Sequence, residues 1–265
     1  MRSLQYRRSV TLLLLIAFFV PASNAQKLAS IIIDDLGNNL EYGNQVIDLP
    51  GPVTLAFLPH TEYASELADR AYNSGKEVML HLPLQSVRHY SHTPGTLKLH
   101  MTHNEFISQL EQNLDSVPHI KGINNHMGSL LTRHPGHMDW LMAALAQQGD
   151  LYFVDSKTTN KSVAPLFARK YHVPHLDRDI FLDPDPRPET IHREFSRFIN
   201  KAKQTGYAIA IAHPYPGTIQ FIREHLYQLQ EEGIRLVPVS AIIANRQLEG
   251  EINHVASTGA SGSGL

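Results

Sequence analysis

Residues 31–35 read Ile-Ile-Ile-Asp-Asp, an unbroken apolar run that ends in two adjacent acids. A continuous apolar run, as opposed to an alternating one, is typical of a strand that is buried on both faces. Similar runs follow at 53–58, 77–82, 120–125, 151–155, 207–213 and 235–240, with a weaker one at 172–177. We therefore predict seven or eight buried strands, of which residues 31–35 form the first.

Helical segments fill the gaps between these strands. Thr102 and Glu105 form a T-x-x-E capping box before a helix, and several helices end at a glycine that precedes the next strand: Gly75, Gly149, Gly206 and Gly233. Helix-length crossovers imply parallel pairing. Seven or eight such units in about 220 residues predict an α/β fold with a single (β/α) barrel. The absence of G-x-G-x-x-G and Walker sequences counts against a nucleotide-binding fold.

The composition narrows the possible functions. The 265 residues carry a net charge of −2, so nothing in the charge balance points to a nucleic-acid partner. There is no cysteine, which excludes a disulfide scaffold, a thiolate zinc site and a cysteine nucleophile. The chain has 16 histidines, and a metal bound here must therefore use imidazole and carboxylate ligands.

The two ends of the chain differ from the rest. Basic residues precede an apolar run at 10–20, and Ser23-Asn24-Ala25 follows as a small-x-small cleavage pattern. This order predicts a signal peptide over 1–25, a mature chain without a transmembrane segment, and a periplasmic or secreted protein. Residues 26–248 are expected to form the barrel. Residues 249–265 are polar and rich in glycine and serine, which predicts a disordered tail.

Acids and histidines stand where most of the predicted strands end. In a parallel barrel these ends form one rim, which carries the active site. The polar residues expected at the rim are Asp34, Asp35, His81, Asn124, Asn125, His126, Asp155, Asp177, Arg178, Asp179 and His213. Each alone has a structural explanation, such as a helix cap. Two adjacent acids, however, require a cation or a basic partner, and we interpret the cluster as a functional site.

Two chemistries fit this rim. One is a divalent metal held by a carboxylate and two imidazoles, with a further carboxylate as base and a further histidine as acid. The other is a metal-free glycosidase with a pair of carboxylates, which leaves the histidines unexplained. A serine triad is disfavoured because no G-x-S-x-G sequence is present.

The strand segments resemble the polysaccharide deacetylase (NodB-homology) superfamily, most closely its divergent polysaccharide deacetylase branch, over roughly residues 27–247. IIIDDLG at 31–37 resembles the first-strand motif, VTLAFLP at 53–59 the second, and KEVMLHLPLQ at 76–85 the third. The resemblance implies that Asp34 is the catalytic base and that Asp35 is a ligand of a divalent metal, which we expect to be zinc.

The third motif departs from the family pattern. His81 matches the first of two metal-binding histidines, but Gln85 stands at the second. Because a neutral amide is a poor zinc ligand, we expect His126 at the end of the next strand to replace it. His89 and His92 are the rival ligands, on a long segment from Ser86 to Met101 that we interpret as a lid or binding loop.

Two later motifs supply the remaining roles. LYFVD at 151–155 resembles the motif whose acid orients the catalytic imidazole, which implies Asp155. AIAIAHP at 208–214 resembles the motif with the general acid, which implies His213. The arginine that pairs with the base in ordinary members is missing from its place, and we expect Arg178 to supply that charge.

The leading hypothesis is an exported, metal-dependent hydrolase that removes acetyl groups from a glycan, such as peptidoglycan or another envelope polysaccharide. The alternative is a catalytically weak barrel that serves as a carbohydrate-binding or envelope-assembly module, with an envelope protein as a further partner. Bound metal separates the two hypotheses, because an enzyme of this type requires it.

Overall fold

The computed structural model describes residues 26–88 and 93–248. The predicted signal peptide, the predicted tail, and the candidate ligands His89 and His92 lie outside the described residues. Within the described ranges, no helix combines the length and the apolar character that crossing a lipid bilayer requires.

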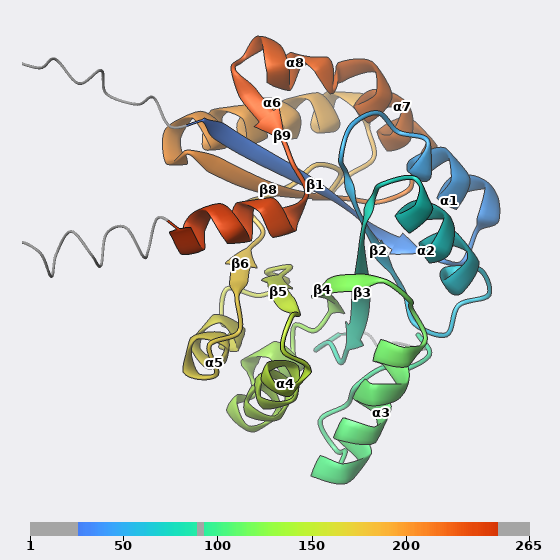
Figure 1. Ribbon diagram of the computed structural model, residues 1–265, viewed down its shortest axis with the longest axis vertical. Helices are drawn as coiled ribbons and strands as arrows, with labels where there is room; N and C mark the ends of the chain where they lie inside the picture. The colour runs from blue at the N-terminus through green and yellow to red at the C-terminus, as the bar shows by residue number, and fades with distance from the viewer. Residues whose placement is uncertain (1–25, 89–92, 249–265) are drawn as a thin grey trace, which may run out of the picture.

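A parallel sheet forms the centre of the molecule, and it curls into a barrel with helices outside it (Figure 1). The strand order is β6-β5-β4-β3-β2-β1-β8-β7, and β9 also pairs with β1. All pairings between strands are parallel, as the helix-length crossovers predict. The strands are β1 (Lys27–Leu36), β2 (Thr54–Phe57), β3 (Glu77–Leu84), β4 (Ile120–Met127), β5 (Tyr152–Asp155), β6 (His175–Asp177), β7 (Ile180–Phe181), β8 (Tyr207–Ala212) and β9 (Ile234–Leu236). The predicted barrel is therefore confirmed.

The two edges of the sheet are joined by one short stretch of chain. Strand β6 pairs with β5, and only two residues later β7 pairs with β8 on the other side. Between them, the Arg178 N–H donates to the Asp155 carbonyl and the Asp179 N–H donates to the Ile209 carbonyl. Residues 175–182 thus connect the two edges of the sheet, although the described strands β6 and β7 do not pair with each other, and they contain a strand, β7, that the hydrophobic pattern did not predict.

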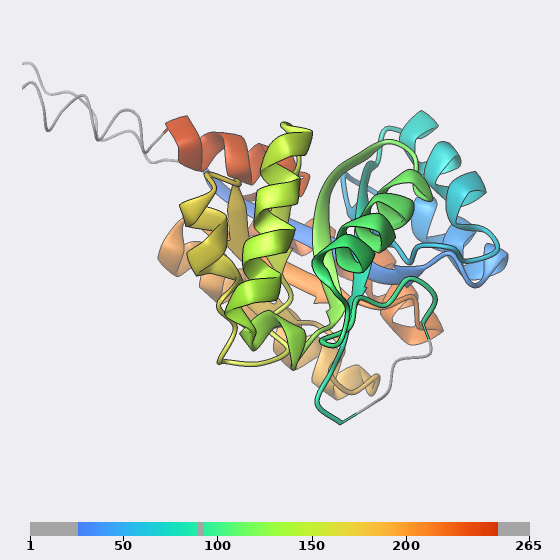
Figure 2. The same ribbon diagram turned by 90° about the horizontal axis from the view of Figure 1, so that it is seen from below.

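Helices cover the outside of the sheet on the connections between strands. Their bounds are α1 (Leu40–Ile47), α2 (Ala64–Asn73), α3 (His103–Asp115), α4 (Pro135–Gln148), α5 (Ala164–Lys170), α6 (Pro188–Thr205), α7 (Pro216–His225) and α8 (Tyr227–Glu231), with a short 3₁₀ turn, η1, at Leu131–Arg133. The predicted capping box at Thr102 is present on α3, which lies beside α4 (Figure 2). The four glycines expected at helix ends all have positive φ.

Buried side chains form two cores, one on each face of the sheet. The outer core lies between the sheet and the helices and includes Ile31, Ile33, Leu80 and Phe153. The inner core fills the barrel, with Ile32 of β1, Met79 of β3, Val154 of β5 and Ile211 of β8 among its members. Because side chains alternate along each strand, a residue at a strand end points into the barrel if it lies two residues from a member of the inner core.

The amino-terminal end of the barrel is closed by the end of the described chain. Residues 239–248 are helical, and Val239, Ile242 and Ile243 pack into the inner core. The Glu77 carboxylate accepts the Ser240 N–H at 3.2 Å and the Tyr152 hydroxyl at 2.8 Å, which fixes the start of this helix to β3 and β5. This end of the barrel is therefore filled, and the candidate site lies at the opposite rim, where the strands end.

Candidate functional site

The two acids of residues 31–35 share the rim because β1 is irregular at that point. Ile33 pairs with Leu55 and Leu36 pairs with Phe57, so β1 has one residue more than β2 over this stretch. Asp35 adopts φ 58°, in the left-handed region. In a regular strand Asp34 and Asp35 would point to opposite faces, whereas a bulge redirects one of them.

The residue after the bulge must be small. Gly37 has φ +113°, and a Cβ at this position would lie 2.0 Å from the Thr61 Oγ1 atom. Thr61 in turn donates its hydroxyl to the Leu58 carbonyl, which holds the loop after β2 against β1. A side chain at residue 37 would push this loop away from the two acids.

Strands β3 and β4 direct their polar residues to the same point. His81 lies two residues after Met79 of the inner core, so it also faces into the barrel. His81 pairs in register with Asn124, and Pro83 pairs with His126, which places His126 one step further along the rim. Both imidazoles therefore approach the carboxylates of β1.

Three side chains converge on one small volume. The Asp35 Oδ1 atom lies 3.2 Å from His81 Nε2 and 2.9 Å from His126 Nδ1, and the two nitrogens are 3.2 Å apart. The Asp35 Oδ1 atom is nevertheless buried and accepts no hydrogen bond of normal geometry. A carboxylate oxygen and two imidazole nitrogens, all within 4.8 Å of one another, are the ligand atoms that zinc uses in catalytic sites.

Asn124 connects this triad to the second acid. Its Oδ1 atom lies 2.7 Å from His81 Nδ1, and its Nδ2 atom donates to Asp34 Oδ1 at 2.7 Å. The first contact assigns the proton of His81 to Nδ1 and leaves Nε2 as the free ligand atom. Asn124 was expected at the strand end without a role, although it lies two residues before His126 and has the same inward position.

The buried charges shift the pKa values of the acids in opposite directions. Burial raises the pKa of the Asp34 carboxyl, against the opposing effects of the His81 and His213 charges and of Asn124. Burial also acts to raise the pKa of Asp35, but the His126 and His81 imidazoles outweigh it and hold that pKa well below its usual range. Asp35 is thus the permanent anion, and Asp34 is the carboxylate closer to proton exchange.

His213 reaches the rim from the other neighbour of β1. Ile33 pairs with Ala212, so His213 follows β8 beside Asp34 on β1. Its Nδ1 atom lies 2.9 Å from Asp183 Oδ1, and its backbone N–H donates to Asp183 Oδ2 at 2.8 Å. Burial lowers the pKa of His213, but Asp183, with smaller effects of Asp34 and Asp35, raises that pKa to about 9. The imidazole is therefore protonated at neutral pH.

The acid that orients His213 is Asp183, which corrects the expectation for Asp155. Val154 points into the barrel and Phe153 points outward, so Asp155 shares the outward direction of Phe153. Its Oδ1 atom accepts the Lys157 N–H at 2.8 Å instead. Asp183 follows β7, two residues after the inward Phe181, and β7 pairs with β8. Recognition of the short run 180–183 as a strand would have identified Asp183.

Arg178 does not make the expected contact with Asp34. Its Nε atom donates to the Ser156 carbonyl at 2.7 Å, and its guanidinium carbon lies 3.7 Å from the centre of the Phe181 ring. The charges of Arg178 and Asp34 interact, but no hydrogen bond or ion pair joins them in the described ranges. Arg178 ties the ends of β5 and β6 together.

Gln85 is directed away from the triad. Its side-chain Oε1 atom accepts the Leu99 N–H at 2.7 Å, and its carbonyl accepts the N–H groups of Leu130 and Leu131. Gln85 therefore fastens the segment after β3 to the start of η1.

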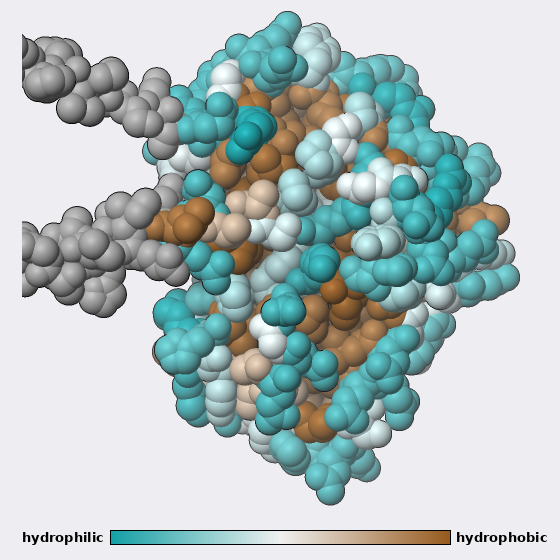
Figure 3. Space-filling model, viewed as in Figure 1, coloured by the Kyte–Doolittle hydropathy of each residue, from teal (hydrophilic) through white to brown (hydrophobic). Residues whose placement is uncertain are grey.

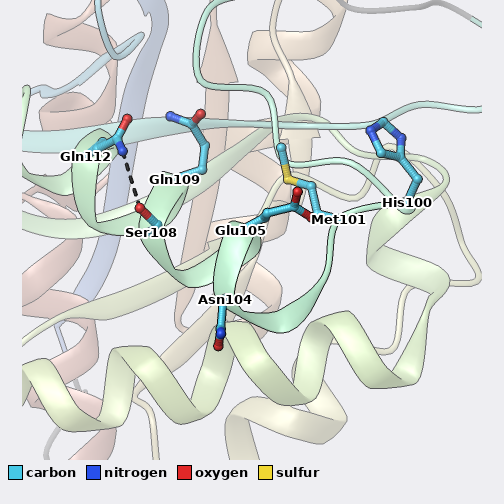
Figure 4. A pocket seen from close by; sticks show the side chains of 7 residues that line it. All are labelled: His100, Met101, Asn104, Glu105, Ser108, Gln109 and Gln112. Atoms are coloured by element: carbon cyan, nitrogen blue, oxygen red, sulfur yellow. Dashed lines mark hydrogen bonds between the residues drawn. The ribbon is translucent and has the colours of Figure 1, made fainter.

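Two other cavities lie apart from the rim cluster. A polar pocket of about 510 Å³ runs along α3, where Gln112 donates to Ser108 at 3.3 Å (Figure 4). A second, of about 790 Å³, lies between α8, β9 and residues 50–52, where hydrophobic residues gather on the surface (Figure 3). Neither is lined by a residue of the triad or by His213.

Substitution of Asp183 by Asn should lower the pKa of His213 by at least about one unit, because the anion that opposes burial is removed. The pKa of His213 is higher in the folded state than its value of 6.5 in the unfolded chain. Protonated His213 therefore stabilises the folded state at pH values below 6.5, and this contribution is lost as the pH rises through about 9. The stability difference between parent and variant should therefore shrink from pH 6 to pH 10. NMR titration of the imidazole and urea unfolding at each pH measure both effects.

The matched control for this substitution is Asp155→Asn, which removes a buried acid on the outward face. It should leave the pKa of His213 unchanged. An equal shift in both variants would assign the raised pKa to the net charge of the barrel and not to Asp183.

Comparison with known proteins shows the family of the chain. A family model described as divergent polysaccharide deacetylase matches residues 31–243. The uncharacterized protein YibQ of Escherichia coli (strain K12) is 36% identical over 225 residues, which are 85% of this chain and 70% of YibQ.

Solved structures share the fold. The crystal structure of an uncharacterized protein from Agrobacterium tumefaciens C58 has a TM-score of 0.78 at 23% identity, over 84% of this chain and 92% of that one. The peptidoglycan deacetylase PdaC from Bacillus subtilis has a TM-score of 0.51 at 16% identity, over 86% of this chain and 96% of that one. By the family match and the level of identity to YibQ, the chain belongs to the divergent polysaccharide deacetylase family.

Proposed function

We propose that the protein is an exported, metal-dependent hydrolase that removes acetyl groups from a glycan. The observation that carries this proposal is the convergence of Asp35, His81 and His126 on one point, with the buried Asp34 on one side and the protonated His213 on the other. Family membership supports the class of reaction.

The residues of the triad fit a divalent metal, and we propose zinc. They offer one anionic oxygen and two neutral nitrogens, and the buried Asp35 Oδ1 atom has no hydrogen bond that would compete for its lone pair. Asn124 holds His81 in the tautomer that a ligand requires. A zinc ion bound here would polarise an acetyl carbonyl and acidify a water molecule.

Proton transfer is the task of Asp34 and His213. Asp34 has a raised pKa, and its Oδ2 atom lies 3.5 Å from His81 Nε2 at the edge of the triad, so it is suited to take the proton of the water that attacks the acetyl carbon. His213 carries a proton on the opposite neighbour of β1 and gives it to the departing nitrogen or oxygen. The acetyl bond breaks, and acetate and a free amino or hydroxyl group result.

The proposed substrate is an acetylated polysaccharide of the cell envelope, such as peptidoglycan. The name of PdaC identifies that polymer as the substrate of a protein with the same fold. The basic and apolar segments before Ala25 support export to the periplasm or beyond the cell.

Export predicts that the mature protein begins at Gln26. Mass spectrometry of the protein from the envelope fraction should find this amino terminus. Recovery of intact Met1 from that fraction would show that residues 1–25 are retained.

The metal assignment is tested by zinc titration. The parent should bind one zinc ion, and His126→Ala should weaken that binding at least about 100-fold, since an imidazole ligand is lost. Gln85→Ala is the matched control and should bind zinc as the parent does, because the Gln85 amide points to Leu99. The reverse result would show that residue 85 and not His126 completes the site.

Turnover is tested by acetate release from oligomers of N-acetylglucosamine. With zinc bound, Asp34→Asn and His213→Ala should each lower turnover by about 10²–10⁴-fold, because each removes one proton-transfer group. Zinc affinity should stay near that of the parent. A parent protein that binds zinc but releases no acetate from any acetylated glycan would favour the carbohydrate-binding or envelope-assembly alternative.

A further inference from the structure

A third cavity of about 490 Å³ opens at the same rim as the triad. Its walls come from the ends of three neighbouring strands and the segments that follow them: Val87 and Arg88 after β3, Met127 at the end of β4 with Ser129 and Arg133 after it, and Thr158 after β5. It is thus formed by the same strand ends that carry His81 and His126.

The cavity adjoins the triad along the chain, because Met127 of its wall directly follows His126 in β4. Met127 follows His126 directly, with φ 55°, and turns the chain away from the barrel. The Met127 carbonyl accepts the Thr158 hydroxyl at 2.8 Å and the Asn125 side-chain amide at 2.7 Å. These bonds hold the wall of the cavity at the residue that follows the triad ligand His126.

Among the described residues that line it, the cavity carries two arginines and no acid. Arg88 and Arg133 are exposed, and neither makes an ion pair or a side-chain hydrogen bond in the part of the chain that the structure describes. The nearby Lys157, by contrast, pairs with Asp177 at 3.0 Å. Two unneutralised guanidinium groups at the mouth of one cavity attract an anion, and each can bind an oxyanion through two parallel hydrogen bonds.

The walls are held in place before any ligand arrives. The Val87 N–H donates to Ser129 Oγ at 3.1 Å, and the Leu130 N–H donates to the Gln85 carbonyl at 3.2 Å. These bonds join the segment with Arg88 to the segment with Arg133. A cavity with fixed walls loses little entropy when it binds a ligand.

The geometry points to a subsite for an anionic group of the glycan, held by Arg88 and Arg133 beside the triad. This inference rests on the proposed function, and it narrows the substrate to an acidic polysaccharide. The anionic group is a carboxylate or a phosphate, which present the same oxygen chemistry to a guanidinium group.

Binding of matched sugars tests the subsite. N,N′-diacetylchitobiose is neutral, the disaccharide of N-acetylglucosamine and N-acetylmuramic acid adds a carboxylate, and N-acetylglucosamine 1-phosphate adds a phosphate. Calorimetry is performed on zinc-loaded protein with Asp34→Asn, so that no acetyl group is lost during the titration. The parent for comparison carries this same substitution.

The double variant Arg88→Gln/Arg133→Gln should bind at least one of the acidic sugars about 10–100-fold more weakly, because charge-assisted hydrogen bonds are lost. Chitobiose binding should change less than about twofold. Whichever acidic sugar shows the loss identifies the anion. Arg169→Gln, which removes an exposed arginine of α5 that lines none of these cavities, is the control and should have no effect.

The outcomes separate this subsite from the proposed function. If the protein with Asp34 intact releases acetate but the double variant binds all three sugars as its parent does, the subsite is wrong and the proposed function stands. If no acetate is released but binding of an acidic sugar depends on Arg88 and Arg133, the subsite stands and the proposed function is wrong.

Discussion

The extra residue of β1 at Asp34–Asp35 is the constraint on which the rim depends. It brings two consecutive side chains of a buried strand to one place, which regular alternation forbids. A residue other than glycine in the left-handed region costs about 1–3 kcal/mol, and such strain persists only where surrounding structure enforces it. Here β1 is hydrogen-bonded to β2, β8 and β9, so the strand cannot shift its register to relieve the strain.

This placement creates a charge problem that the neighbouring strands resolve. Two adjacent carboxylates, of which Asp34 is buried and Asp35 is partly buried, are costly unless each has a partner. Asp34 receives the amide of Asn124, and Asp35 faces two imidazoles whose nitrogens also face each other. One carboxylate oxygen and two imidazole nitrogens that face a common point fit a divalent cation, which is the partner we propose for these three side chains.

The alternation of side-chain direction along each strand also decides which acid forms a hydrogen bond with His213. Asp155 is the last residue of β5, Asp183 lies two residues after β7, and both are buried. Only Asp183 has the inward position, in register with His213 on the adjacent strand. Asp155 points outward and holds the turn at Lys157. The arginines near the rim also differ in role. Arg178 is hydrogen-bonded and holds strand ends together, whereas Arg88 and Arg133 have no partner within the described residues.

The sequence alone determined the barrel, the positions of seven strands and one weak strand, and the convergence of Asp35, His81 and His126. Hydrophobic periodicity and helix caps are local, and strand ends in a parallel barrel meet at one rim whatever the details of packing. The tertiary structure alone decided the role of Asn124, the pairing of Asp183 with His213 and the closure of the barrel through β7. These depend on register and side-chain direction, because a strand of two residues is too short to show periodicity, and a shift of one residue reverses the face to which a side chain points.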